Sequence, residues 1–169
     1  MGNYRGGVAS ATVIHPRGSD VSPSAPRPRP VIDWFGDGSV VVVDLAMACC
    51  AIESEFAVPA GALRRSDVPE GSRVVAVVSG TVTDVLAPEV AAVIAGLPEP
   101  HVVSFGSCAC AGGPYWDAYC VTKGIDQWVP VDTYVPGCPP PPRALAEVVD
   151  AVRAGRRPDA PSVLGEVHT

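Results

Sequence analysis

The chain has 169 residues and a net charge of −6, with 47% hydrophobic and 18% charged side chains. This length supports one domain with a hydrophobic core and is too short for two domains of ordinary size. The acidic charge without a basic stripe argues against nucleic acid as a ligand, and no apolar stretch approaches the ~20 residues of a membrane-spanning helix.

Composition divides the chain into three parts. Residues 1–30 are rich in Gly, Ser, Pro and Arg and end in a Pro-Arg-Pro-Arg-Pro run, which predicts a disordered arm. That arm either has no role or orders along a neighbouring subunit. Residues 31–157 contain the long apolar segments and form the predicted α/β domain, and residues 158–169 form a predicted flexible tail.

Apolar runs and turn residues alternate along residues 31–157 at the spacing of strand–helix–strand units. Strands are predicted over residues 40–43 (extending to about 46), 73–79, 101–105 and 128–131. Helices are predicted over residues 51–57, 84–95 and 143–154, and residues 115–123 are moderately helical. Thr83 is the expected N-cap of the second helix, and Pro142 suits the first turn of the last. We therefore predict an α/β fold: a small flavodoxin-like parallel sheet of about four strands with helices on both faces.

Four of the six cysteines lie where an apolar strand pattern changes to a turn or to the start of a helix. Cys49 and Cys50 are adjacent and follow the first strand, whereas Cys108 and Cys138 follow later strands within glycine- or proline-rich turns. Loops after parallel strands gather at one edge of the sheet, so these thiols are predicted to converge there. A helix that begins at the tandem pair would aim free backbone N–H groups at the thiols and favour thiolates.

Four converging thiolates are the ligand set of a 4Fe-4S cluster, whose sulfides also need backbone N–H groups close by. Glycines permit that approach, and the candidates are Gly106, Gly112, Gly113 and Gly137. Structural zinc is less favoured because no Cys-x2-Cys pair is present, and disulfides are less favoured in a reducing compartment. Unreactive buried cysteines are a third alternative, against which the tandem pair at a helix start argues.

Three segments carry a resemblance to a known family. They are Ala-Cys-Cys-Ala-Ile-Glu at residues 48–53, Gly-Ser-Cys-Ala-Cys-Ala-Gly-Gly-Pro-Tyr at 106–115 and Val-Pro-Val-Asp-Thr-Tyr-Val-Pro-Gly-Cys-Pro-Pro at 129–140. In this order they closely resemble the B subunit of NADH:quinone oxidoreductase, respiratory complex I, and more distantly the small subunits of nickel-iron hydrogenases. The match covers roughly residues 44–154, and the tandem cysteines favour the complex I side.

The resemblance implies an electron-transfer subunit of a respiratory NADH:quinone oxidoreductase-like complex, which acts as an oxidoreductase only within the assembly. It implies one terminal 4Fe-4S cluster that passes electrons to quinone, with the ligands Cys49, Cys50, Cys108 and Cys138. The implied partners are an upstream iron-sulfur subunit and a quinone-site or catalytic large subunit, with quinone at the interface. The expected location is the cytoplasmic side of the cell membrane, bound peripherally and without a transmembrane segment of its own. Cys110 and Cys120 fall outside the implied ligand pattern.

The chain departs from the family pattern after the tandem cysteines. The family has an apolar, methionine-bearing stretch that lines the quinone chamber, whereas residues 54–58 are Ser-Glu-Phe-Ala-Val. A carboxylate at Glu55 is costly beside a quinone tail unless it is paired or solvated. The alternatives are therefore a small subunit of a hydrogenase-like or specialised paralogous redox complex with a different acceptor, or a cluster-free structural subunit. A nucleotide-binding flavodoxin-like protein is disfavoured because residues 106–113 lack a phosphate-loop pattern.

Three acidic residues are candidates for coupling proton uptake to reduction. They are Glu53, Asp132 and Asp117, each close in sequence to one of the cysteine segments. The alternative interpretation is that these carboxylates are solvated or cap helices.

Overall fold

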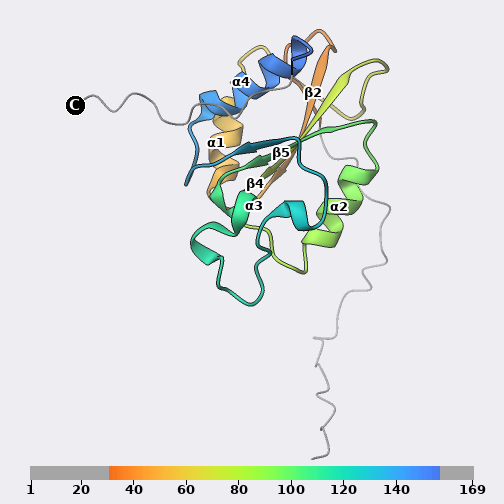
Figure 1. Ribbon diagram of the computed structural model, residues 1–169. Coiled ribbons are helices and arrows are strands. Elements are labelled where there is room, and N and C mark those ends of the chain that lie inside the picture. Colours follow the sequence, from red (N-terminus) through yellow and green to blue (C-terminus); the bar gives the residue numbers. More distant parts are fainter. Residues whose placement is uncertain (1–30, 157–169) are drawn as a thin grey trace, which may run out of the picture.

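A six-stranded sheet forms the centre of the computed structural model, which describes residues 31–156 (Figure 1). The predicted arm at 1–30 and tail at 158–169 lie outside the described residues. In sheet order the strands are β3 (Leu63–Arg65), β1 (Val31–Asp33), β2 (Val40–Ala46), β4 (Arg73–Ser79), β5 (His101–Phe105) and β6 (Thr133–Val135). The helices are α1 (Cys50–Ala57), α2 (Ala87–Ala95), α3 (Ser107–Ala111) and α4 (Pro142–Arg153), with the 3-10 helices η1 (Gly113–Tyr115) and η2 (Ile125–Gln127).

Strands β2, β4, β5 and β6 are parallel neighbours, which confirms the predicted α/β fold. Their last residues are register partners and form one row across the sheet: Ala46, Ser79, Phe105 and Val135. β1 and β3 add antiparallel pairings beside β2, so the sheet is mixed and has two more strands than predicted. The loops that follow the four parallel strands therefore start from a common edge.

Both faces of the parallel strands are buried, because alternate side chains of a strand point to opposite sides. In β2, Val41 and Val43 belong to the core beneath α2 and α3, whereas Val40 and Val42 belong to the core beneath α1 and α4. Figure 1 shows these two pairs of helices on opposite faces of the sheet. The near-continuous valine runs of β2 and β4 are the consequence of this double burial.

The segment before β6 differs from the prediction. A strand over residues 128–131 is wrong, because the ladder with β5 forms at Thr133–Val135 and the preceding residues follow η2. Pro130 has no N–H to donate in the middle of that segment, and Val129 packs into the core on the α2 side instead.

The first turn of α2 also differs from the prediction. The helix begins at Ala87, and its N-cap is Leu86 rather than Thr83. Thr83 forms the preceding turn, in which its Oγ1 accepts a hydrogen bond from Leu86 N–H at 3.4 Å. Residues 115–123 are mostly irregular rather than helical, and Val121 forms a single antiparallel bridge with Thr83.

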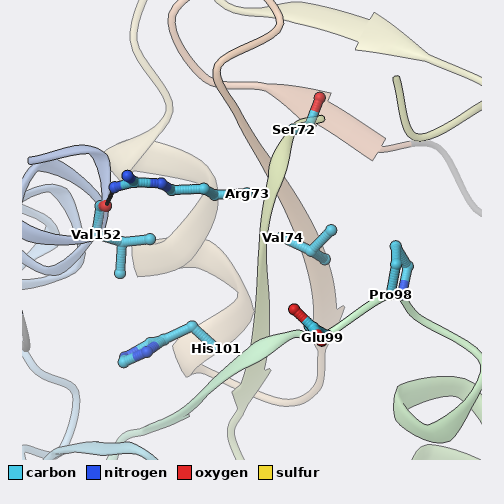
Figure 2. A pocket seen from close by; sticks show the side chains of 7 residues that line it. All are labelled: Ser72, Arg73, Val74, Pro98, Glu99, His101 and Val152. Carbon is cyan, nitrogen blue, oxygen red and sulfur yellow. Dashed lines mark hydrogen bonds between the residues drawn. The ribbon is translucent and has the colours of Figure 1, made fainter. Parts of the chain in front are cut away.

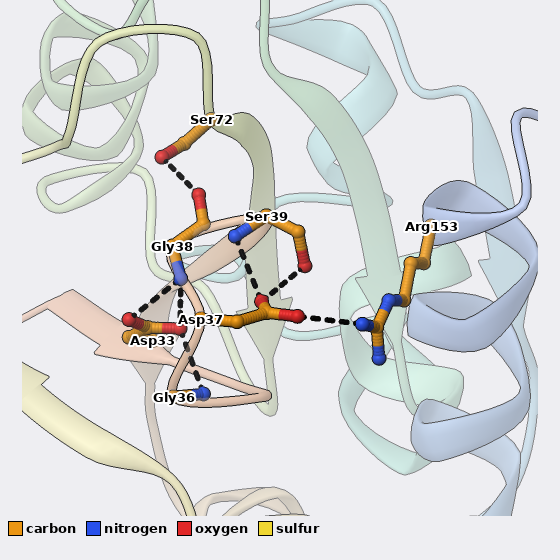
Figure 3. A network of polar contacts seen from close by, with 7 residues as sticks. All are labelled: Asp33, Gly36, Asp37, Gly38, Ser39, Ser72 and Arg153. Carbon is orange, nitrogen blue, oxygen red and sulfur yellow. Dashed lines mark hydrogen bonds and ion pairs between the residues drawn. The ribbon is translucent and has the colours of Figure 1, made fainter.

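The amino edge of the parallel strands is closed by a polar network (Figure 3). The Asp33 carboxylate accepts hydrogen bonds from the N–H groups of Gly36 and Gly38 in the β1–β2 turn, each at 3.0 Å. Asp37 of the same turn pairs with Arg153 of α4 at 2.6 Å, and the Arg153 guanidinium lies 3.9 Å from the centre of the Phe35 ring. These contacts fix the turn against the end of α4.

A pocket of about 360 Å³ lies at this same amino edge, between the starts of β4 and β5 and the end of α4 (Figure 2). Arg73, which lines it, donates hydrogen bonds to the carbonyl oxygens of Val152 and Arg153 (2.9 Å to the latter) and so caps α4. His101 Nε2 is 2.9 Å from Thr133 Oγ1. Ligands of α/β sheets usually bind at the opposite, carboxyl edge of the strands, so we assign these polar groups at the amino edge a structural role.

Within residues 31–156 no helix is long and apolar enough to cross a membrane.

Candidate functional site

Backbone hydrogen bonds fasten the cysteine-bearing loops to one another at the carboxyl edge of the sheet. The bonds run from Met47 N–H to Ser79 C=O (2.8 Å), from Gly80 N–H to Phe105 C=O (3.2 Å) and from Gly106 N–H to Val135 C=O (2.8 Å). Each bond joins the residue after one parallel strand to the last residue of the neighbouring strand. The loops after β2, β4, β5 and β6 are thus held side by side.

Gly80 sets how closely the loop after β2 approaches the end of β4. Its φ is +89°, and a Cβ at this position would lie 1.8 Å from the carbonyl oxygen of Met47. Only glycine permits this contact, because the neighbouring atom belongs to the backbone and cannot rotate away. The β2–α1 loop therefore lies directly over Gly80, and α1 begins immediately afterwards at Cys50.

Cys50 is the innermost of the four predicted ligands. Its side chain is 2% exposed, and its Sγ lies so close to Gly106 that a Cβ there would be 2.5 Å away. Gly106 has φ +94° and precedes α3, whose first residue, Ser107, donates its N–H to Gly137 C=O at 2.8 Å. The starts of α1 and α3 and the loop after β6 consequently meet at one point.

Cys108 and Cys138 lie on the two other loops that reach this point. Cys108 is buried in α3, and a Cβ on Gly113 would lie 2.8 Å from its Sγ. Cys138 follows Gly137, is exposed and precedes Pro139 through a cis peptide bond. Two predicted cofactor-binding glycines, Gly106 and Gly113, therefore make room for thiols. Gly137 serves the backbone contact with Ser107 described above.

Gly112 has a structural position instead. It ends α3 in the left-handed conformation with φ +79°, and a Cβ there would lie 2.9 Å from the Cα of Trp116. The glycine thus permits the sharp turn from α3 into η1. Its contact with the thiols is indirect, through the end of the helix that carries Cys108.

Cys50 lies close enough to the three other predicted ligand cysteines for their charges to act on its thiol. Burial raises the pKa of the Cys50 thiol to about 12, and the neighbouring Cys49, Cys108 and Cys138 contribute to that rise by charge repulsion. Cys49 also contributes a hydrogen bond that favours the neutral thiol. Bringing four thiolates together here would require a compensating positive charge.

The cysteines of the described chain do not form a site for one metal ion. Among residues 31–156, no group of three or more His, Cys, Asp and Glu side chains is arranged so that it could hold one metal ion. Cys50 and Cys108 are buried, whereas Cys49 and Cys138 are exposed. The site is therefore open toward solvent on one side.

Cys110 and Cys120 are the two cysteines that are not among the predicted ligands. The Cys110 thiol donates a weak hydrogen bond to the Ser104 carbonyl at 3.4 Å, and burial raises its pKa. Cys120 is exposed in the irregular segment after η1. The charge of Cys108 also raises the pKa of Cys110, so this thiol lies near one of the predicted ligands.

The structure separates the three acidic candidates for proton coupling. Asp132 lies at the amino edge of the sheet, where its carboxylate accepts a hydrogen bond from Val102 N–H at 2.8 Å. Asp132 is therefore far from the cysteines. Val102 lies near the start of β5, whereas the loop that carries Cys108 follows the end of this strand at the opposite edge of the sheet. Asp117 is exposed in the segment after η1, and Glu53 is half-buried on α1, three residues after Cys50.

A polar group beside the site was not expected from the sequence. Asp44 of β2 accepts a hydrogen bond from Ser54 Oγ of α1 at 2.7 Å, and Ser79 Oγ of β4 lies 3.4 Å from its other oxygen. The sequence does contain a signal for this group. Asp44 follows directly on an apolar β-branched run, and a carboxylate in such a strand faces a buried layer, where it needs polar partners.

Helix α1 also carries an exposed apolar surface next to the cysteines. Phe56 is 75% exposed and Ile52 59%, and with Ala51 and Glu55 they line a pocket of about 370 Å³. Glu55 forms an ion pair with Arg64 of β3. Arg64 therefore balances the charge of the Glu55 carboxylate at the rim of this apolar pocket.

Comparison with known proteins identifies the family of the chain. Residues 42–152 match the family of the NADH ubiquinone oxidoreductase 20 kDa subunit. The chain is 47% identical over 132 residues to the second NADH-quinone oxidoreductase B subunit of Streptomyces griseus subsp. griseus, covering 73% of this chain and 56% of that relative. It is 45% identical over 152 residues to the first NADH-quinone oxidoreductase B subunit of Salinispora tropica, covering 78% and 80% of the two chains. The chain thus spans little more than half the length of the first of these relatives and most of the second.

A solved structure shares the fold. It is a chain of the membrane-bound sulfane sulfur reductase, an archaeal respiratory membrane complex, with a TM-score of 0.55, 26% identity and 72% of each chain covered. The family match spans β4, β5, β6 and most of β2, and it includes all four predicted ligand cysteines. The chain belongs to the family of the 20 kDa subunit of NADH:ubiquinone oxidoreductase.

Proposed function

We propose that this chain is an electron-transfer subunit of a respiratory NADH:quinone oxidoreductase-like complex and holds its terminal 4Fe-4S cluster. The proposed ligands are Cys49, Cys50, Cys108 and Cys138. The convergence of these four thiols at the carboxyl edge of the parallel sheet carries the proposal. The family relationship supports the same type of complex.

When bound, the cluster supplies a one-electron carrier. The chain contributes the environment that tunes it. Cys50 and Cys108 are held in a buried layer by α1 and α3, and Gly106 and Gly113 let the backbone approach their sulfurs. Close backbone groups, burial and local charge set the potential of such a site. The exposed Cys49 and Cys138 lie on the side that a partner subunit would cover.

We infer that the acceptor is quinone, bound between α1 and a neighbouring large subunit. The pocket lined by Ile52 and Phe56 follows the tandem cysteines by less than two helical turns and presents an apolar surface that a quinone ring or tail would cover. The electron donor would be an upstream iron-sulfur subunit. In this proposal the chain lies peripherally on the cytoplasmic side of the cell membrane, held there by its partners.

A different acceptor is the second candidate. The Glu55–Arg64 ion pair places two charges at the edge of the α1 pocket, which suits a more polar acceptor than a quinone tail. The solved structure of similar fold belongs to a complex named for sulfane sulfur reduction rather than for quinone. This alternative keeps the cluster and the four ligands and changes only the electron acceptor.

Single cysteine substitutions test the ligand set. We expect Cys→Ala at Cys49, Cys50, Cys108 or Cys138 to lower the iron content of the anaerobically purified chain from about four per chain toward zero. The matched controls Cys110→Ala and Cys120→Ala should retain the wild-type iron content, since neither cysteine belongs to the proposed ligand set. Full iron content in Cys138→Ala, or loss in both controls, would contradict this ligand assignment.

The acceptor is tested in the assembled complex. After reduction by NADH, addition of a soluble quinone should reoxidise the cluster signal of the wild-type complex. Replacing Phe56 with Ser should slow that step without changing the iron content. If quinone leaves the signal reduced while elemental sulfur or polysulfide reoxidises it, the different-acceptor candidate is correct.

A further inference from the structure

Cys138 is the proposed ligand with the least support from secondary structure. Cys50 and Cys108 lie within α1 and α3, and Cys49 is the N-cap of α1. Cys138 lies instead in the loop between the end of β6 and the start of α4. The residue is exposed, and the charge of its thiol nevertheless acts on the buried thiol of Cys50. Contacts of the loop, rather than a helix or strand, therefore have to hold this thiol beside the others.

The composition of this loop leaves it few backbone donors. Five of residues 136–142 are prolines, so only Gly137 and Cys138 carry a backbone N–H. Its two ends are held by backbone hydrogen bonds, one from Gly106 N–H at the end of β6 (2.8 Å) and one within the first turn of α4 (3.0 Å). Between these ends, the hydrogen bonds that the described structure gives the loop all go to Ser107.

Ser107 and Gly137 are joined by three hydrogen bonds. Gly137 C=O accepts one from Ser107 N–H at 2.8 Å and one from the Ser107 hydroxyl at 3.0 Å. Gly137 N–H donates the third to Ser107 Oγ at 3.3 Å. One hydroxyl can donate and accept at the same time, so both polar groups of the glycine backbone are bonded to it. An alanine at position 107 would retain only the bond from its backbone N–H.

Each partner of this contact is the immediate neighbour of a proposed ligand. Ser107 precedes Cys108 at the start of α3, and Gly137 precedes Cys138. The loop turns sharply at Gly137, where φ is +151° and a Cβ would lie 2.5 Å from the Cα of Pro140. The three hydrogen bonds therefore fix the backbone at one ligand relative to the backbone at another.

We propose that Ser107 is a positioning residue, whose hydroxyl holds the loop after β6 against α3 and so fixes the exposed ligand Cys138 relative to Cys108. The inference rests on the proposed function, because it concerns how one ligand of the cluster is held. Gly137 N–H, which the sequence predicted for the cofactor, is bonded to Ser107 instead. Ser107 thus acts on the site through Cys138 and is not itself a ligand.

Amide hydrogen exchange of the anaerobically purified full chain tests the contact itself. A proteolytic fragment that covers residues 136–142 reports only on Gly137 and Cys138, because the other residues are prolines. Ser107→Ala should raise the exchange rate in this fragment roughly five- to tenfold, the effect of about one lost hydrogen bond. Ser107→Thr keeps a hydroxyl at this position and should retain the wild-type rate.

The rate at which iron passes from the same protein to a chelator tests the positioning of the ligand. Ser107→Ala should release iron roughly five- to tenfold faster, since the same hydrogen bonds oppose the departure of Cys138. Ser72→Ala is the matched control, because the Ser72 hydroxyl also donates to a glycine carbonyl, that of Gly38 at 2.6 Å, and lies at the amino edge of the sheet. This control and Ser107→Thr should release iron at the wild-type rate.

The outcomes separate a positioning role from a loss of overall stability. A wild-type rate of exchange or of iron release in Ser107→Ala would overturn the inference. Equal acceleration of iron release in Ser72→Ala, or no restoration in Ser107→Thr, would overturn it as well. A wild-type chain without iron would instead contradict the proposed function, and the exchange measurement would still show whether Ser107 holds the loop.

Discussion

Replacing Gly106 with Ala tests the contact on which the cysteine site depends. The added Cβ would lie 2.5 Å from Cys50 Sγ. Ordinary contacts between non-bonded heavy atoms are about 3.5–4.0 Å, so the thiol has to move by about 1 Å. The backbone of Gly106, at φ +94° and ψ 151°, is also in a region that essentially only glycine adopts. Both effects act on the same point of the site.

The expected destabilisation is about 2–4 kcal/mol, from a backbone term of about 1–3 kcal/mol and an overpacking term of similar size that relaxation of Cys50 reduces. Gly71→Ala is the matched control, because Gly71 has φ +80° and an added Cβ there would meet nothing within 4 Å. The control should lose only about 1–2 kcal/mol and keep its iron.

Urea unfolding and iron content of anaerobically purified protein measure the two effects separately. We expect Gly106→Ala to lose more stability than Gly71→Ala and most of its iron. If Gly106→Ala retains full iron content and is no less stable than the control, Cys50 does not lie against Gly106 and the expected contact is refuted.

Three other predictions follow from contacts elsewhere in the chain. Gly80→Ala should prevent formation of a soluble folded chain, because its Cβ would lie 1.8 Å from a backbone oxygen; soluble, cooperatively unfolding protein would contradict this. Arg153→Met removes an exposed ion pair with Asp37 and a contact with the Phe35 ring, so it should cost about 1 kcal/mol in urea unfolding and leave the iron content unchanged. Burial raises the folded-state pKa of Asp44 above 3.8, so the folded chain binds the proton more tightly than the unfolded chain and this contribution to stability is lost as pH rises through the raised pKa. Asp44→Asn should therefore gain stability relative to the wild type as pH rises above 3.8 in thermal unfolding, and a constant difference would contradict the shift.

The long buried strands were predictable because their sequences carry both hydrophobicity and clear ends. The predicted strands over residues 73–79 and 101–105 coincide with β4 and β5. β1 and β3 have three residues each, which is too short for a periodic pattern, and their place in the sheet depends on pairing with β2. The misplaced strand at 128–131 shows the same limit, since Pro130 interrupts an apolar segment that packs without joining the ladder.

The convergence of the cysteines was predictable for a related reason. Strand ends and turn residues mark loops, and parallel strands bring their following loops to one edge. The acidic residues were not predictable in this way. Asp132 lies close to Cys138 in sequence, but its carboxylate is bonded to Val102 N–H at the opposite edge. Asp44 acquires its partners from α1 and β4, which sequence proximity does not reveal.

The central claim is that three loops bring four thiols around a single iron-sulfur cubane. It is tested most directly by electron paramagnetic resonance of the anaerobically purified and reduced full chain, integrated against protein concentration, together with its iron and acid-labile sulfide content. We predict one cluster signal per chain with about four irons and four sulfides. A reduced protein without a signal, or one that contains zinc in place of iron, would contradict the account.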